Sequence, residues 1–165
     1  MAIFESLEYS RLVSPAPTTK NHAYGASPRN ADFYYTQVAL GTIGDTINLV
    51  RIDCPRMVVD MFKSWFLFTG WTATATLSIG WRAYTDVDGV PVAEDAAGLL
   101  SAVLLTADGA WSHGMLVVAT PDDSLPVVGR KVFNNRGAVT LFATIGVAAP
   151  GAGDILNGSF CFKTP

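Results

Sequence analysis

The stretch from Trp71 to Trp81, WTATATLSIGW, decides the fold because apolar and polar residues alternate in it without a break. Its Trp, Ala, Leu and Ile residues fall on one face of an extended chain, and its Thr, Ser and Gly residues fall on the other. This period of two is that of a β-strand. A strand of this length spans roughly 36 Å, and its apolar face has to be covered by another layer. The rest of the chain must therefore supply a sheet beside this strand and a layer above it.

Further segments with strand character lie on both sides of this stretch. They are 33–40, 45–52, 57–68, 111–119, 125–133, 139–147 and 155–163. Thr69-Gly70 is short enough to join residues 57–68 and 71–81 as a tight hairpin. With the central stretch, the chain holds about eight strands at short spacing.

One segment has a different pattern. Residues 94–107, EDAAGLLSAVLLTA, place apolar residues at helical spacing behind two acids, which favours a short covering helix. Gly98 weakens this pattern, and another strand is the alternative. About eight strands with at most one short helix predict an all-β fold, an antiparallel two-sheet sandwich of jelly-roll type.

The amino-terminal residues lack a sustained period of either kind and contain Pro15, Pro17 and Pro28. We therefore expect an extended N-terminal arm over residues 1–32 and a β-sandwich domain over residues 33–165. An arm without its own core is either disordered or ordered by a partner. Its apolar residues offer docking points, and the candidate contacts are Phe4, Leu7, Tyr9, Leu12 and Tyr24.

A second candidate contact is the predicted edge strand at 125–133. Pro126, Arg130 and Lys131 are residues of the kind that protect a sheet edge from pairing. We include Arg130 and Lys131 in the candidate interface together with the arm.

The composition points to protein partners. Charged residues make up 15% of the chain, against a usual share of about 25%, and the net charge is −3. No basic patch for nucleic acid or for an anionic membrane is present. The uncharged run from Ser64 to Trp81 is long enough to cross a membrane, but its period of two favours strands. Glu5 and the absence of a basic start followed by an apolar run argue against a signal peptide.

Candidate chemistry is sparse. Ser112 adjoins His113, but neighbouring strand residues point to opposite faces, so the two do not form a nucleophile and base pair. Asp86-Val87-Asp88-Gly89 matches part of a calcium loop, although an ordinary turn is favoured because Tyr84 stands where the first ligand belongs. The sequence predicts no catalytic residue, no cofactor and no metal site.

Two other residue types leave alternatives open. Cys54 and Cys161 match no metal or redox spacing; two buried reduced thiols are favoured, with a disulfide as the alternative. The aromatic residues are either core residues, which is favoured, or a platform for stacking sugars. They are Trp65, Trp71, Trp81, Trp111, Tyr34, Tyr35 and Tyr84.

Four pieces of the chain, in this order, resemble the small β-sandwich decoration or cement proteins of tailed bacteriophage capsids. They are GDTI at 44–47, the Thr-rich strand that ends in Ser78-Ile79-Gly80, TDVDG at 85–89, and ATIGVAAPGAGDILNGSFCF at 143–162. The resemblance covers residues 41–163. It implies a protein that assembles, often as a homotrimer, on the outer capsid surface and bridges neighbouring subunits of the major capsid protein.

These observations lead to two hypotheses. The first is a structural virion protein without enzymatic activity, made in the host cytoplasm, that decorates and stabilises a phage capsid. The second is a carbohydrate-binding or host-attachment module of a phage tail or fibre, which uses exposed aromatic residues.

Overall fold

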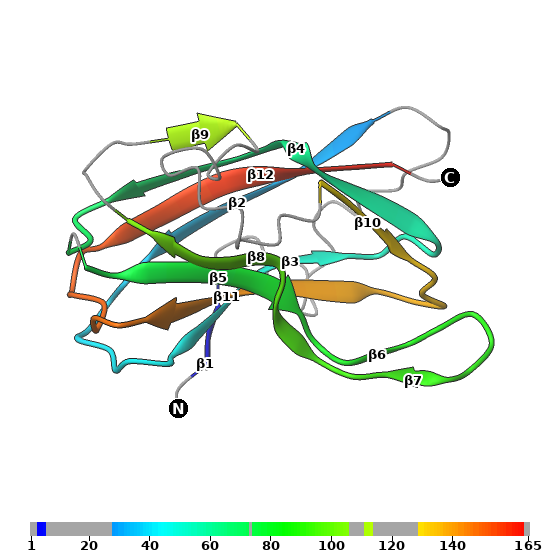
Figure 1. Ribbon diagram of the computed structural model, residues 1–165, viewed down its shortest axis with the longest axis horizontal. Coiled ribbons are helices and arrows are strands. Elements are labelled where there is room, and N and C mark those ends of the chain that lie inside the picture. The colour runs from blue at the N-terminus through cyan, green and yellow to red at the C-terminus, as the bar shows by residue number, and fades with distance from the viewer. Residues whose placement is uncertain (1–2, 6–27, 73, 106–110, 114–128, 164–165) are drawn as a thin grey trace.

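The computed structural model describes residues 3–5, 28–72, 74–105, 111–113 and 129–163 (Figure 1). These residues contain strands, turns and loops and no helix. Two β-sheets lie face to face as a sandwich, which Figure 1 shows as an upper and a lower layer. The described residues contain no apolar helix of membrane-spanning length.

The upper layer in Figure 1, which we call sheet B, has the strand order β10-β4-β12-β2, and β9 also pairs with β4. Its strands are β2 (Arg29–Thr36), β4 (Met57–Thr69), β9 (Trp111–His113), β10 (Arg130–Phe133) and β12 (Ile155–Lys163).

The lower layer, sheet A, has the order β1-β3-β11-β5-β8. Its strands are β1 (Ile3–Glu5), β3 (Thr46–Ile52), β5 (Thr76–Trp81), β8 (Asp95–Leu104) and β11 (Val139–Gly146). A small two-stranded sheet of β6 (Tyr84–Thr85) and β7 (Pro91–Val92) projects beyond one end of the sandwich in Figure 1.

The order of the longer strands is that of a jelly roll. Counted along the chain as one to eight, β2, β3, β4, β5, β8, β10, β11 and β12 form one sheet in the order 6-3-8-1 and the other in the order 2-7-4-5. All neighbours within these two sets are antiparallel. This is the double Greek-key connectivity of two-sheet jelly rolls. The predicted fold class is confirmed, and β1 adds a parallel strand at the free edge of β3.

The core lies between the inner faces of the sheets. Phe33, Phe66 and Phe160 stack with ring centres 5.2 to 6.0 Å apart, and the Trp81 ring meets Phe133 edge-on at 5.4 Å. Trp71 is also buried, and its indole N–H donates to the carbonyl of Ile155 at 2.7 Å. Burial of large aromatic rings supplies much of the stabilisation of such a core.

The predicted hairpin between residues 57–68 and 71–81 is wrong. β4 ends at Thr69 in sheet B, whereas β5 begins at Thr76 in sheet A. Gly70 has a φ of +88°, a backbone conformation that favours glycine, and the N–H of Ala75 donates to the carbonyl of Thr72 at 2.9 Å. This turn carries the chain from one sheet to the other, because β4 pairs with β12 and β10 while β5 pairs with β11 and β8.

The favoured helix at residues 94–107 is also wrong, because residues 95–104 form β8. In the pairing of β8 with β5, Leu77 lies opposite Val103 and Ile79 lies opposite Leu100, so three residues of β8 match two of β5. The extra residue is a bulge at Ala102, whose φ is +48° and whose N–H donates to the Ser78 hydroxyl. The bulge gives buried residues a spacing of three, which imitates a helix.

The remaining strands match the prediction with small shifts. Expected segments 45–52, 57–68, 139–147 and 155–163 are β3, β4, β11 and β12 within a residue or two. β2 runs from Arg29 to Thr36 instead of 33–40, so it begins before the expected domain start at residue 33. β10 lies at the end of its sheet, as expected of an edge strand. Of the predicted strand 111–119, only β9 lies within the described residues.

Candidate assembly surface

The acidic turn at residues 85–89 is closed by hydrogen bonds to its own backbone. Asp86 follows β6, and its Oδ1 accepts the backbone N–H groups of Asp88 at 2.9 Å and Val90 at 2.7 Å. Gly89 has a φ of +84°, which closes the turn. The Asp86 carboxylate thus caps its own loop, and the ordinary-turn interpretation is confirmed. Within the described part of the chain, no group of three His, Cys, Asp or Glu side chains lies close enough to hold a metal ion.

The cysteines and several aromatic residues are core residues. Cys54 and Cys161 are separate, buried thiols, as the favoured interpretation predicted. Burial is the largest cause that raises the pKa of each thiol. Tyr35, Trp71 and Trp81 are buried, so these three rings cannot form a sugar-stacking platform.

The structure places the predicted contact residues in separate surroundings. Phe4 lies in β1, in register with Ile47 of β3, while Leu7, Tyr9, Leu12 and Tyr24 lie outside the described residues. Arg130 Nε binds Asp60 Oδ2 at 3.1 Å. Lys131 Nζ lies 4.5 Å from the centre of the Trp81 ring. Both cations therefore have partners within the chain.

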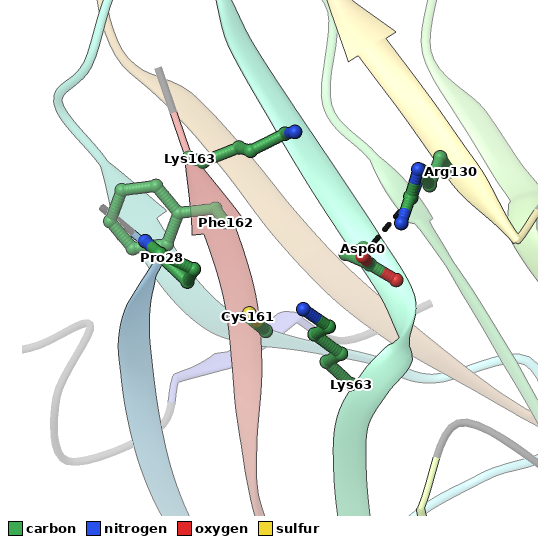
Figure 2. Close-up of a pocket in the computed structure, with 7 residues that line it drawn as sticks. All are labelled: Pro28, Asp60, Lys63, Arg130, Cys161, Phe162 and Lys163. Carbon is green, nitrogen blue, oxygen red and sulfur yellow. Dashed lines mark hydrogen bonds and ion pairs between the residues drawn. The ribbon is translucent and has the colours of Figure 1, made fainter. Parts of the chain in front are cut away.

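Figure 2 shows a pocket beside the Arg130 and Asp60 ion pair, lined also by Lys63, Cys161 and Lys163. Its volume is about 120 Å³. Ligand pockets of proteins hold about 300 to 1,000 Å³. This pocket is too small to hold a sugar ring together with the sugar units on either side of it.

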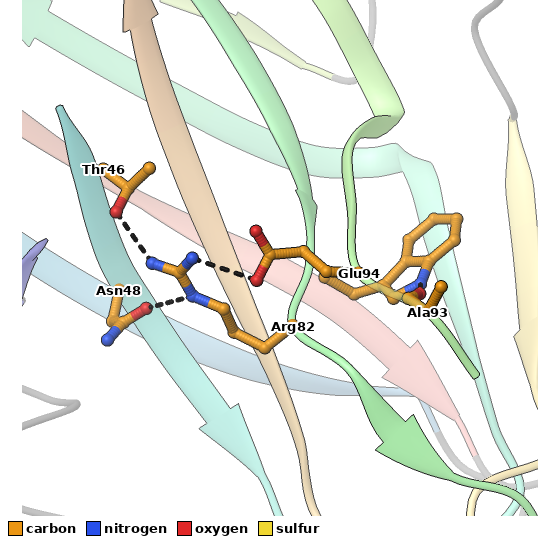
Figure 3. Close-up of polar contacts among 6 residues, drawn as sticks. Thr46, Asn48, Arg82, Ala93 and Glu94 are labelled. Carbon is orange, nitrogen blue, oxygen red and sulfur yellow. Dashed lines mark hydrogen bonds and ion pairs between the residues drawn. The ribbon is translucent and has the colours of Figure 1, made fainter. Parts of the chain in front are cut away.

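A polar cluster closes part of the outer face of sheet A (Figure 3). The Arg82 guanidinium donates to Asn48 Oδ1 at 3.0 Å and Thr46 Oγ1 at 2.8 Å, both on β3. It also binds Glu94 Oε2 at 3.1 Å. The same guanidinium covers the ring of Phe142, so its role is to hold strands together and to shield an apolar side chain.

Two loops, 37–45 and 147–154, lie with the β4–β5 turn at the end of the sandwich opposite the β6–β7 hairpin (Figure 1, left). They run side by side, joined by backbone hydrogen bonds from Gln37 N–H to Asp154 O at 2.8 Å and from Gly41 N–H to Pro150 O at 3.0 Å. A return bond from Gly153 N–H to Gln37 O measures 2.8 Å. Each loop therefore fixes the path of the other.

Two buried carboxylates make these loops rigid. Asp45 accepts the N–H of Thr42 at 2.7 Å and its hydroxyl at 2.8 Å. Asp154 Oδ2 accepts the N–H of Gly151 at 2.6 Å. A carboxylate that bonds its own loop in this way holds a turn without any contact from a partner.

Four aliphatic side chains stand out from this frame: Val38 is 92% exposed, Leu40 78%, Ile43 61% and Val147 66%. We call these four residues the end patch. Val147 has a φ of +64°, which is a strained conformation for a β-branched residue. Exposed aliphatic side chains on a rigid frame suit contact with another protein.

The sequence contains a signal for the end patch in the composition of its two loops. Residues 37–44, QVALGTIG, and 146–153, GVAAPGAG, hold no charged side chain. Surface loops that face water normally carry charged side chains. The strand interpretation of residues 33–40 placed Val38 and Leu40 in a sheet, whereas β2 ends at Thr36 and both belong to the loop.

Comparisons with known proteins support the fold. No family model and no curated protein sequence matches the chain. Among solved structures, a chain in the capsid of Ralstonia phage GP4 is similar over 99% of both chains, with a TM-score of 0.53 and 14% identity. Chains from infectious bursal disease virus, of the Gx strain and of a VP2 subviral particle, give TM-scores of 0.41 and 0.43 at 13% identity. These two cover 92% and 93% of this chain but only 36% and 38% of their own. At 14% identity, the likeness to the GP4 chain shows a shared fold.

Proposed function

We propose that this chain is a structural component of a phage capsid that decorates the shell from outside and stabilises it by bridging neighbouring major capsid subunits. The observation that carries the proposal is the end-to-end likeness of its jelly roll to a chain of a phage capsid. The likeness covers 99% of each chain. Jelly rolls are common in viral capsids and in lectins, and the surface has to decide between them.

The surface favours assembly over sugar binding. The end patch presents uncharged aliphatic side chains on a rigid frame, while Tyr35, Trp71 and Trp81 lie in the core. Sugar sites combine exposed aromatic faces with convergent polar groups. Tyr34 is 46% exposed, but it does not line the small pocket described above, so the carbohydrate-binding module is the weaker hypothesis.

The energetics of decoration suit a small protein with low charge. A protein that binds only the assembled shell stabilises that shell by mass action. Many identical contacts then add through avidity, so that each contact can be weak. In this proposal the chain is a homotrimer, its partner is the major capsid protein, and the arm makes the contact with the shell. β1 gives one example of arm pairing, since it adds to the free edge of β3 through main-chain hydrogen bonds.

The test is the number of copies in purified virus particles, measured by quantitative mass spectrometry against the major shell protein. We expect a count in the hundreds, as a lattice-wide decoration protein requires. A handful of copies would place the protein at the tail or a single vertex, and absence from the particle would overturn the virion role.

A truncation tests the role of the arm. Deleting residues 1–27 removes most of the predicted arm, including β1, and leaves β2, which begins at Arg29, intact. We expect the truncated protein to lose binding to capsids that lack the decoration protein. A truncated protein that still binds such capsids with full affinity would contradict the assignment of the arm.

A further inference from the structure

We propose that the end patch is the surface through which a second copy of this chain binds. The four aliphatic side chains of the patch are exposed on two loops that are fixed to each other. A partner has to cover them for the surface to lose its contact with water. Charge, hydrogen bonding and rigidity each favour another copy as that partner.

The charge argument starts from the two loops. Every residue in 37–44 and 146–153 is uncharged. The two acids that flank them, Asp45 and Asp154, are 2% and 6% exposed and accept hydrogen bonds within their own loops. A charged partner would find no counter-charge at the end patch. Two copies, each with a net charge of −3, can bring these ends together without placing like charges in contact.

The hydrogen-bond argument concerns what a partner would have to supply. The backbone N–H groups of Gln37, Gly41 and Gly44 donate to Asp154, Pro150 and Ile145, respectively. The N–H of Ala148 donates to Gly146 at 2.8 Å. These four donors therefore need nothing from outside, and the exposed aliphatic side chains of the patch call for apolar contact. The same patch on a second copy offers that, whether two copies meet as a pair or three copies meet around a threefold axis.

The rigidity argument concerns the cost of binding. Ordering mobile loops opposes association, and a surface that is already fixed avoids that cost. The carboxylates of Asp45 and Asp154 fix these loops in the single chain. Val147 adds to this, because a β-branched residue with positive φ persists only where the surroundings impose it.

The proposal can be tested separately from the virion role, because self-association needs no virus particle. We would measure the molar mass of the full chain by sedimentation over a range of concentrations. Wild-type protein should form a dimer or a larger closed oligomer. The double variant Leu40→Asp with Ile43→Asp should weaken association more than about tenfold, since it brings four charges into a dimeric contact.

Val90→Asp is the matched control. Val90 is an exposed aliphatic residue on the β6–β7 hairpin, 55% exposed, at the other end of the sandwich (Figure 1). This variant should associate as wild type does. Circular dichroism and thermal unfolding of each variant establish that it is folded.

A second variant separates association from folding. Val147→Gly relieves the positive φ and removes one side chain of the patch, so it should fold at least as well as wild type and associate more weakly. A wild-type protein that is monomeric at every concentration would overturn the proposal. So would an oligomer whose dissociation constant is unchanged in the double variant and in Val147→Gly.

Discussion

The guanidinium carbon of Arg82 lies 3.8 Å from the centre of the Phe142 ring, and Phe142 is fully buried although it points away from the core between the sheets. Ile47 and Leu49, which flank Asn48 on β3, point into that core. Arg82 therefore acts as a lid on the outer face of sheet A, held in place by its bonds to β3. The positive charge of the guanidinium attracts the face of the Phe142 ring, and its N–H donors remain hydrogen-bonded at the same time.

Arg82→Ala should lower the free energy of unfolding by about 2 kcal/mol, because it uncovers Phe142 and leaves the oxygen acceptors on β3 without a donor. Urea unfolding followed by tryptophan fluorescence measures this change. Glu94→Gln is the control. It keeps the guanidinium in place and removes an ion pair with the 42% exposed Glu94 side chain, which we expect to cost less than about 0.5 kcal/mol. Equal losses in the two variants would contradict the lid.

The parts of this fold that could be predicted from the sequence are those in which local pattern and tertiary environment agree. β11 and β12 lie where strands are expected at 139–147 and 155–163, and Leu156, Phe160 and Phe162 are buried in the core. The central stretch was identified as a strand, but its first half is a turn after Gly70. Periodicity describes one strand at a time, so it cannot tell which strand lies beside it.

The wrong assignments arise from pairing between distant segments. The spacing of Leu100 and Val103 reflects a bulge that exists only because β8 pairs with β5. The end patch was missed for the same reason. The local sequence pattern does not indicate that loop 37–45 lies along the loop that ends at residue 154. This pairing keeps Val38 and Leu40 outside the sheet.

Gly80 sets how closely β8 can approach β5. A Cβ atom at this position would lie 1.7 Å from the carbonyl oxygen of Asp95. Gly80→Ala should therefore push the two strands apart and lower stability by about 3 kcal/mol or prevent folding. Gly137→Ala is the control, because a Cβ there meets nothing within 4 Å. We expect it to change stability by less than about 0.5 kcal/mol. Thermal unfolding of both variants decides the matter.

Tyr35 should make the protein sensitive to alkali. Burial, together with the negative charges of Asp45 and Asp154, raises the pKa of Tyr35 from 10.0 to about 12. The folded state therefore binds this proton more tightly than the unfolded state. The resulting stability is fully present below about pH 10 and is lost as the pH rises to about 12, an amount on the order of 2 to 3 kcal/mol.

The measurement is the urea midpoint at several pH values between about 9 and about 12 for wild type and for Tyr35→Phe. The variant should show a shallower fall because it has no proton to lose at this position. Parallel curves for the two proteins would show that Tyr35 does not contribute to the alkaline loss.

The two thiols should resist modification in the folded protein. Cys54 is 3% exposed and Cys161 5%, and burial raises the pKa of both above the ordinary value. Because the thiolate is the reactive form, a thiol reagent at mildly alkaline pH should react slowly with native protein and fast after unfolding. Mass spectrometry counts the labels. Ala152→Cys, at an exposed loop position, should add one fast label, and rapid labelling of the native thiols would contradict their burial.

Val147 and Val38 should respond to glycine with opposite signs, although both are exposed valines of the end patch. Val147 has a φ of +64°, where a side chain with a Cβ costs about 1 to 2 kcal/mol that glycine does not. Glycine also makes the unfolded chain more flexible, which costs about 0.4 to 1 kcal/mol at either position. Val147→Gly should therefore gain up to about 1 kcal/mol, whereas Val38→Gly, at a residue without positive φ, should only lose. Denaturation of the two variants as monomers, at low concentration, compares the effects without the contribution of assembly. Changes of the same sign would mean that the backbone at Val147 is not strained. The positive φ of Val147 would then no longer support a rigid end patch.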